Sequence, residues 1–245
     1  MGLEVCANSF ASALAAEKGG AIRVELCDNM AEGGTTPSYG TIKLTKERLN
    51  IEVWPIIRPR GGDFLYTDDE FELMKNDIQI CKDLGCDGVV FGILSPNGEI
   101  DKERCRQLLD FASPIPSAFH RAFDMCNDLE KGLEELINLG FVRVLSSGGA
   151  ENAVKGVQKL SELVKLSNNR IEIMPGVGIN PQNIKFIKEK TGARVFHASA
   201  RVKHPSKMAF RNENTNMGSV EEEYSIDQTS TELVKETVLA LNSSI

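Results

Sequence analysis

The pattern Glu-x-Cys occurs twice near the start of the chain, ending at Cys6 and at Cys27. Side chains alternate along a β-strand, so the glutamate and the cysteine of each pattern share a face. If the two segments are neighbouring strands, about 4.8 Å apart, with this face inward, the two thiols meet. Paired thiolates are soft ligands that suit Cu(I), which makes Cys6 and Cys27 candidate metal ligands. The alternative is packing, because free cysteine also behaves as a small buried hydrophobic residue.

A second set of residues could bind an anion. Glycine-rich segments expose backbone N–H groups, and arginine adds a planar fork of donors that matches carboxylate and phosphate oxygens. The candidate anion ligands are Arg58, Arg60, Arg121, Ser147, Gly148, Gly176, Gly178 and His197. Two alternatives stay open here. The glycines could form tight turns, and the arginines could pair with Glu4, Glu25 or Asp124 in a structural network.

Acid–base chemistry is a third possibility. His120 and Asp124 lie close together in the chain, and in a barrel Glu25 would face them across the same opening. A carboxylate can orient an imidazole and fix its tautomer, as general-base catalysis requires. The candidate catalytic residues are therefore Glu25, His120 and Asp124. The alternative is that His120 is a hydrogen-bonded structural residue at the end of a strand.

A repeated joint indicates which elements position these residues. Helical patterns end at Gly19, Gly85, Gly140 and Gly192, and a β-branched run follows within a few residues each time. Glycine tolerates the left-handed conformation at the end of a helix, so this is the signature of a helix leading into a parallel strand.

The complete pattern predicts eight strands that alternate with eight helices. The expected strands are Leu3–Cys6, Ile22–Leu26, Glu52–Ile57, Gly88–Phe91, Ser117–His120, Arg143–Leu145, Glu172–Met174 and Arg194–His197. The expected helices are Ser9–Lys18, Leu44–Leu49, Asp69–Leu84, Lys102–Phe111, Asp128–Leu139, Asn152–Leu166, Asn183–Lys190 and Thr231–Leu241. We therefore predict an α/β fold, a single (β/α)₈ barrel over residues 1–245 with a long loop at 202–230 before the last helix. The competing open sheet lacks its Gly-x-Gly-x-x-Gly motif after the first strand.

The barrel prediction places the candidate residues at one end of the molecule. Active sites of this fold lie at the C-terminal ends of the strands, and phosphate sites commonly use the loops after strands seven and eight. Every candidate metal, anion and catalytic residue lies at or just after the end of a predicted strand. The four remaining cysteines, Cys81, Cys86, Cys105 and Cys126, are expected to be inert.

Composition excludes several classes of protein. The 245 residues are 41% hydrophobic and 26% charged, which is typical of a folded soluble chain. The net charge of -7 argues against a nucleic-acid or membrane-surface partner. We find no apolar run of membrane-spanning length and no secretory signal at the N-terminus, so we expect a cytoplasmic protein whose six cysteines are reduced.

Longer motifs closely resemble the CutC family, the copper homeostasis proteins. These are Gly-Gly-Thr-Thr-Pro-Ser at 33–38, Arg-Pro-Arg-Gly-Gly-Asp-Phe-Leu-Tyr at 58–66 and Phe-His-Arg-Ala-Phe-Asp at 119–124. The match continues through residues 144–148 and 196–201, so it covers essentially the whole chain, and the segment after it looks most like the animal-type members.

The resemblance implies a cytosolic barrel, with a nuclear location as well in eukaryotes, that handles copper and holds Cu(I) at Cys6 and Cys27. It also implies a homo-oligomer, a dimer or a tetramer. The segment 202–230 supports this because it carries Met208, Phe210, Met217 and Tyr224, which need a surface to pack on. The alternative function is an enzyme that acts on an anionic or phosphorylated small molecule at the same mouth.

Overall fold

The computed structural model describes residues 1–212, 214–215 and 223–243 and contains eight parallel strands. The strands are β1 Gly2–Ala7, β2 Arg23–Leu26, β3 Glu52–Pro55, β4 Val89–Phe91, β5 Ser117–Phe119, β6 Arg143–Ser146, β7 Glu172–Pro175 and β8 Val195–Ala198. Hydrogen bonds join them in the orders β3-β2-β1-β8 and β4-β5-β6-β7. Ile57 N donates to Val90 O at 2.7 Å and so links β3 to β4, while β7 and β8 lie side by side. The predicted (β/α)₈ fold is confirmed.

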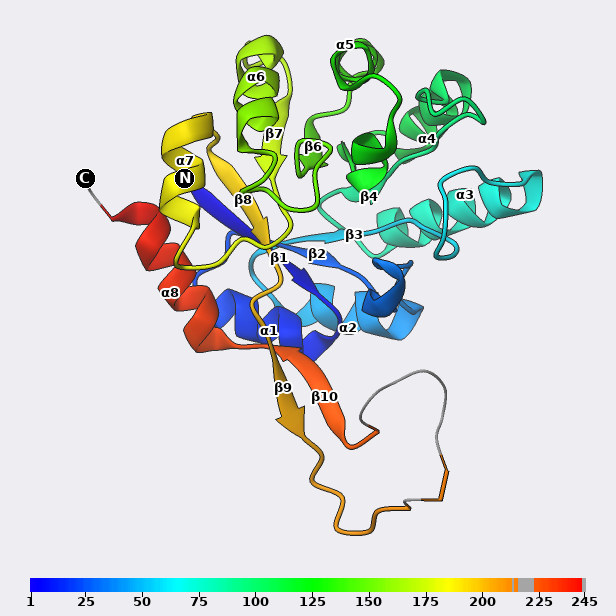
Figure 1. The fold of residues 1–245 in the computed structure, drawn as a ribbon. Helices are drawn as coiled ribbons and strands as arrows, with labels where there is room; N and C mark the ends of the chain where they lie inside the picture. The colour runs from blue at the N-terminus through cyan, green and yellow to red at the C-terminus, as the bar shows by residue number, and fades with distance from the viewer. Residues whose placement is uncertain (213, 216–222, 244–245) are drawn as a thin grey trace.

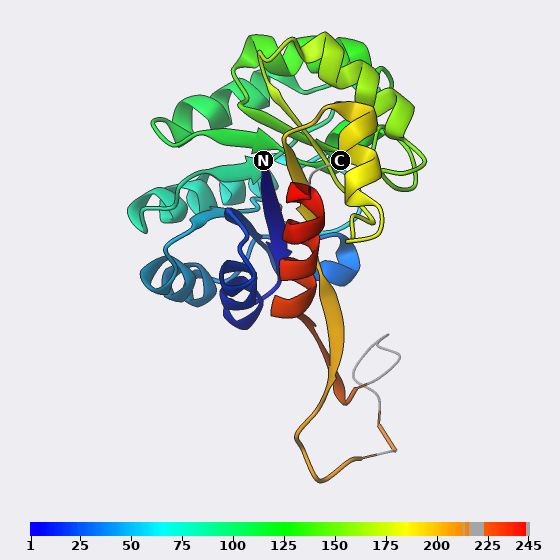
Figure 2. The same cartoon turned by 90° about the vertical axis from the view of Figure 1, so that its left-hand side faces the viewer.

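Helices surround the strands on the outside (Figures 1 and 2). They are α1 Phe10–Lys18, α2 Tyr39–Arg48, α3 Asp68–Asp83, α4 Lys102–Ala112, α5 Leu129–Leu139, α6 Val157–Ser167, α7 Ile184–Thr191 and α8 Thr231–Asn242. Their apolar faces pack on the strands and form the main hydrophobic core. Within the described ranges, no helix combines the length and the hydrophobicity that crossing a membrane demands.

Local sequence explains where the helices begin. Thr67 and Glu70 form a capping box at the start of α3, in which each side chain accepts from the other residue's backbone N–H. Ser38 caps α2, which is longer than the predicted helix. Helix α6 begins five residues later than predicted, at Val157 instead of Asn152. Gly156, the residue before the helix, packs so closely on Ser147 that a Cβ there would lie 1.8 Å from the Ser147 carbonyl oxygen.

The segment 202–230, which was predicted to be a long loop, instead contains the two strands of a hairpin. Strands β9 Arg201–Pro205 and β10 Ser225–Thr229 pair in antiparallel fashion and project away from the barrel (Figures 1 and 2). We call the hairpin, with the described residues between its two strands, the arm. Met208 and Phe210, which follow β9, are 60% and 73% exposed, and Tyr224, just before β10, is half-buried. Met217 lies outside the described residues.

Candidate metal centre

A cavity of about 460 Å³ opens where the parallel strands end. The predicted site residues that line it are Cys6, Glu25, Arg58, His120, Arg121, Gly178 and His197. Those that are not part of its lining are Cys27, Arg60, Asp124, Ser147, Gly148 and Gly176. The cavity is far larger than one metal ion and is therefore of a size to admit a small organic molecule.

Three sulfur atoms meet at one side of this cavity. Cys6 Sγ lies 3.2 Å from Cys27 Sγ, and Met30 Sδ lies 3.6 Å from Cys6 and 3.0 Å from Cys27. Strands β1 and β2 are parallel neighbours, and Cys27 N extends their ladder by donating to Ala7 O at 2.9 Å. Met30 begins the short 3₁₀ helix Met30–Glu32 that follows. We call these three residues the sulfur triad.

Ile56 packs against the sulfur triad on one side. The hydrogen bond with Cys27, together with burial, raises the pKa of the Cys6 thiol well above its usual value. Cys6 is therefore a neutral thiol that must lose its proton when it binds a metal. Two thiols and a thioether are soft donors, which are the ligands that soft metal ions prefer. Met30 was not among the predicted ligands, although its position three residues after Cys27 was a usable signal.

A buried ion pair lies beside the sulfur triad. His197 Nε2 is 2.9 Å from Glu25 Oε2, and the Glu25 and His197 residues are only 4% and 9% exposed. Burial is the largest single influence on His197 and would lower its pKa, but the charge of Glu25 and the hydrogen bonds with Cys6 and Glu25 together raise this pKa well above the usual value. Burial would likewise raise the pKa of Glu25, but the charge of His197 and the hydrogen bonds with His197 and Cys6 together lower it. The pair is thus an imidazolium and a carboxylate.

The histidine that Glu25 contacts is not the predicted one. His197 is opposite Glu4 in the β1–β8 pairing, and its ring reaches across β1 to β2. His120 is held separately, because its Nδ1 accepts a hydrogen bond from Ala122 N at 3.2 Å. The stagger between barrel strands decides which inward side chains meet, and the sequence does not give this stagger.

Asp124 organises a loop instead of orienting His120. Its carboxylate accepts from Ser146 Oγ at 2.6 Å and from Ser147 N and Gly149 N at 3.0 Å. Arg121 Nε donates to it at 2.9 Å. This is the structural network that was the alternative for Arg121.

The other two predicted arginines differ in their environment. Arg58 is 4% exposed and donates to three carbonyl oxygens, those of Glu32, Gly34 and Gly62, at 2.7 to 2.8 Å. It pairs with no carboxylate among the described residues, and its Nε has no hydrogen-bond partner there. Arg60, by contrast, pairs with Glu70 at 2.6 Å and with Asp63 at 3.0 Å.

The glycine-rich loops offer fewer free donors than predicted. Gly148 N donates to Ser146 Oγ at 2.8 Å, and Gly176 N donates to Ser146 O at 2.9 Å. The backbone N–H groups of residues 177–179 donate to no acceptor among the described residues. Val177 has a φ of 74°, which costs a β-branched residue on the order of 1–3 kcal/mol and is typical of functional loops.

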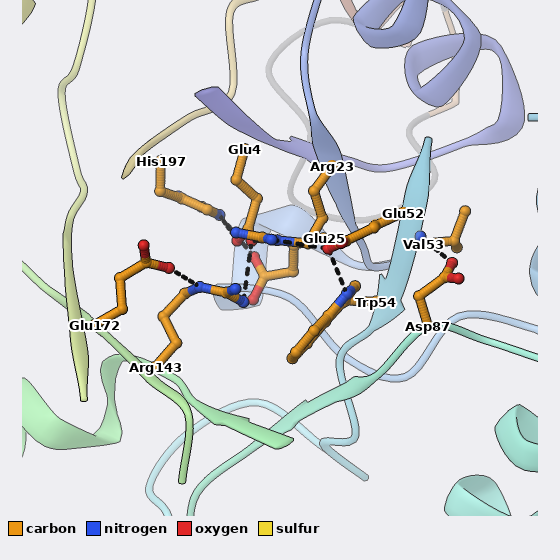
Figure 3. A network of polar contacts seen from close by, with 10 residues as sticks. All are labelled: Glu4, Arg23, Glu25, Glu52, Val53, Trp54, Asp87, Arg143, Glu172 and His197. Atoms are coloured by element: carbon orange, nitrogen blue, oxygen red, sulfur yellow. Dashed lines mark hydrogen bonds and ion pairs between the residues drawn. The ribbon is translucent and has the colours of Figure 1, made fainter. Parts of the chain in front are cut away.

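A second charged network fills the barrel interior toward the N-terminal ends of the strands (Figure 3). Glu4 pairs with Arg23 and lies 3.8 Å from Arg143. The two arginines also pair with Glu52 at 2.8 Å and with Glu172 at 2.7 Å. Trp54 has both guanidinium groups over its ring, at 5.4 and 4.6 Å from its centroid. No functional residue was predicted at this end of the barrel.

Comparison with known proteins agrees with the motifs in the sequence. The model of the CutC family matches residues 1–202. The chain belongs to the CutC family. It is 51% identical over 236 residues to a family protein CutC of Parabacteroides distasonis, covering 95% of this chain and 97% of that one. It is 49% identical over 217 residues to the copper homeostasis protein cutC homolog of Homo sapiens, covering 89% of this chain and 80% of that one. A solved CutC structure from Streptococcus agalactiae has a TM-score of 0.78 at 40% identity, and the match covers 81% of this chain and 99% of that one.

Proposed function

We propose that this CutC chain handles copper by binding one Cu(I) ion between Cys6 and Cys27, with Met30 as a third ligand. The observation that carries the proposal is the sulfur triad, whose three sulfurs lie 3.0 to 3.6 Å apart. The human and mouse relatives are named copper homeostasis proteins, which supports a role in copper homeostasis. Thiols this close would join as a disulfide in an oxidising compartment, so we place the protein in the cytosol or nucleus, where thiols stay reduced.

Titration with Cu(I) in the presence of a competing chelator tests this function. We expect the wild type to bind one equivalent and the Cys6→Ser/Cys27→Ser variant to lose this binding. Met30→Leu should weaken the affinity by at least about tenfold, or about 1.4 kcal/mol, because the thioether ligand is gone. Cys126→Ser, which changes a half-buried cysteine outside the cavity lining, is the control. Equal affinity in the wild type and the double variant would contradict the proposal.

The arm supports the prediction of a homo-oligomer, a dimer or a tetramer. A two-stranded hairpin alone in water is marginally stable, and this one exposes Met208, Phe210 and Ile226, the last at 59%. We expect light scattering to give a multiple of the 26.9 kDa chain mass. A triple serine variant at these positions should shift the protein toward the monomer. Phe186→Ser, at an apolar position 41% exposed on α7, should leave the mass unchanged. A wild type of monomer mass at micromolar concentration would contradict the prediction.

Arg58 favours a second candidate function, the binding of an anionic small molecule in the same cavity. A buried guanidinium without a carboxylate partner favours an anion beside it. His120 Nδ1 is an acceptor, so in the neutral ring Nε2 carries the proton, and this N–H has no partner among the described residues. Arg58 and His120 both line the cavity.

A thermal-shift screen of phosphorylated and carboxylated metabolites tests this second function. A ligand at a hundred times its dissociation constant should stabilise the wild type by about 2.7 kcal/mol. We expect Arg58→Gln to abolish the shift and Arg60→Gln to retain it, because Arg60 is already neutralised by Glu70 and Asp63. If both variants respond like the wild type, Arg58 only holds the loops that supply its three carbonyl partners.

A further inference from the structure

We propose that the cavity also holds a divalent cation of borderline softness, such as Zn²⁺, bound by Cys6, Glu25 and His197. Their donor atoms all lie within 4.8 Å of one another. One sulfur, one carboxylate oxygen and one imidazole nitrogen are each ordinary ligands of Zn²⁺. The site shares Cys6 with the sulfur triad and does not depend on Cu(I) binding.

The three donors lie on three neighbouring strands of one sheet. Cys6 lies on β1, and its two hydrogen-bonded neighbours β2 and β8 supply Glu25 and His197. The residues are 6%, 4% and 9% exposed, so their positions are fixed by packing. A site built on adjacent strands of one sheet keeps its donors in place more closely than a site on loops.

The chemistry of these donors separates this site from the sulfur triad. Thiolate suits both Cu(I) and Zn²⁺, whereas a thioether is a ligand of soft Cu(I), and imidazole and carboxylate oxygen belong to the ligand set of Zn²⁺. His197 Nε2 and Glu25 Oε2 are hydrogen-bonded to each other at 2.9 Å, so a cation would take the place of the proton between them. Cys27 and Met30 complete the soft set on the other side of Cys6. One cavity therefore presents two ligand sets of different softness.

The surroundings indicate what such an ion would do. Structural zinc sites have four protein ligands, whereas sites that act on a small molecule have three and keep a position open. All three donors line the cavity of about 460 Å³, and Arg58 lines it as well. The remaining coordination position is thus available to water or to an oxygen of a small molecule in the cavity.

Titration with Co²⁺ under reducing, anaerobic conditions tests the site. Tetrahedral Co²⁺ with a thiolate ligand gives strong visible bands and a sulfur-to-cobalt charge-transfer band, and hydrated Co²⁺ does not. We expect these bands in the wild type at one equivalent and their loss when Zn²⁺ is added. His197→Gln and Glu25→Gln should bind Co²⁺ at least about tenfold more weakly. His204→Gln, at an exposed histidine on the arm, is the control.

Parallel Cu(I) titrations separate this site from the proposed function. We expect Met30→Leu to weaken the binding of Cu(I) and to leave the binding of Co²⁺ unchanged. His197→Gln should weaken the binding of Co²⁺ and leave that of Cu(I) unchanged, and Cys6→Ser should weaken the binding of both ions. X-ray absorption of the Zn²⁺-loaded wild type should show one sulfur among nitrogen and oxygen ligands. This measurement needs no variant to fold. A spectrum of octahedral Co²⁺ without charge transfer, or a zinc environment of two or more sulfurs, would overturn the proposal whatever the Cu(I) result.

Discussion

Replacing Glu4 with glutamine is expected to lower the free energy of unfolding by about 3 kcal/mol, the low end of the range for breaking a buried ion pair. Glu4 is 1% exposed and faces the guanidinium groups of Arg23 and Arg143. The neutral amide would leave their two charges without this carboxylate in the barrel interior. The rim carboxylates of Glu52 and Glu172 remain, which is why we expect the low end of the range.

The two arginines of the network already have buried donors without a partner among the described residues. These donors are Arg23 Nη2 and Arg143 Nη1. Each buried donor left unpaired costs about 1–3 kcal/mol of stability. Losing the Glu4 carboxylate would therefore add to a cost that the folded protein already bears. Trp54, the single tryptophan, lies against both arginines and should report the local change through its fluorescence.

Urea unfolding of the wild type and Glu4→Gln measures this effect. The control is Glu134→Gln, which removes the carboxylate from a solvent-exposed pair with Arg170 and should destabilise the protein far less than Glu4→Gln does. Equal destabilisation in the two variants would show that the buried network contributes no more than a surface pair.

The architecture could be predicted because it follows from local rules. Three of the four predicted joints have the expected conformation, since Gly85, Gly140 and Gly192 have φ values of 71°, 96° and 72°. At the first joint Gly19 has a φ of -80°, and the next residue, Gly20, is left-handed at 92°. These left-handed angles are accessible to glycine at low cost and end each helix before the next parallel strand. The repeat along the chain was therefore enough for the (β/α)₈ fold.

The contacts inside the barrel could not be predicted in the same way. Strands two, three, six and seven begin with Arg23, Glu52, Arg143 and Glu172, and this pattern of opposite charges was visible in the sequence. Alternation along a strand does not tell which face is inward, so the charges could as well have been solvent-exposed. The Glu25–His197 pair was missed for a related reason, because strand stagger decides which side chains meet.

His120 is the most isolated titratable group near the cavity. Its residue is 3% exposed, and its ring lies 4.9 Å from Phe64 and 6.0 Å from Phe119. Gly92 packs so closely that a Cβ there would lie 2.7 Å from His120 Nδ1. Burial, with the nearby charge of Arg58, lowers the pKa of His120 to about 3. The ring therefore stays neutral in the folded protein across the physiological range.

This neutral histidine should make the protein sensitive to acid. The pKa of an unfolded histidine is about 6.5, so below that pH the unfolded chain binds a proton that the folded chain refuses. Stability then falls as the pH falls from about 6.5 toward the folded pKa of about 3, by up to about 1.4 kcal/mol per pH unit. Above about pH 6.5 neither state binds the proton, and this contribution to the slope vanishes.

Substituting His120 with asparagine should reduce this loss of stability at acid pH. Asparagine offers a side-chain oxygen in place of Nδ1 to accept from Ala122 N, but it does not titrate. We expect urea unfolding between pH 4 and 6 to show that the free energy of unfolding of His120→Asn changes less steeply with pH than that of the wild type. The difference between the two slopes should correspond to nearly one bound proton. His204→Asn, at an exposed histidine on the arm, should keep the wild-type slope. If His120→Asn keeps the wild-type slope as well, the folded protein charges His120 as readily as the unfolded chain does. The neutral N–H donor that we assign to the anion-binding cavity would then be an imidazolium.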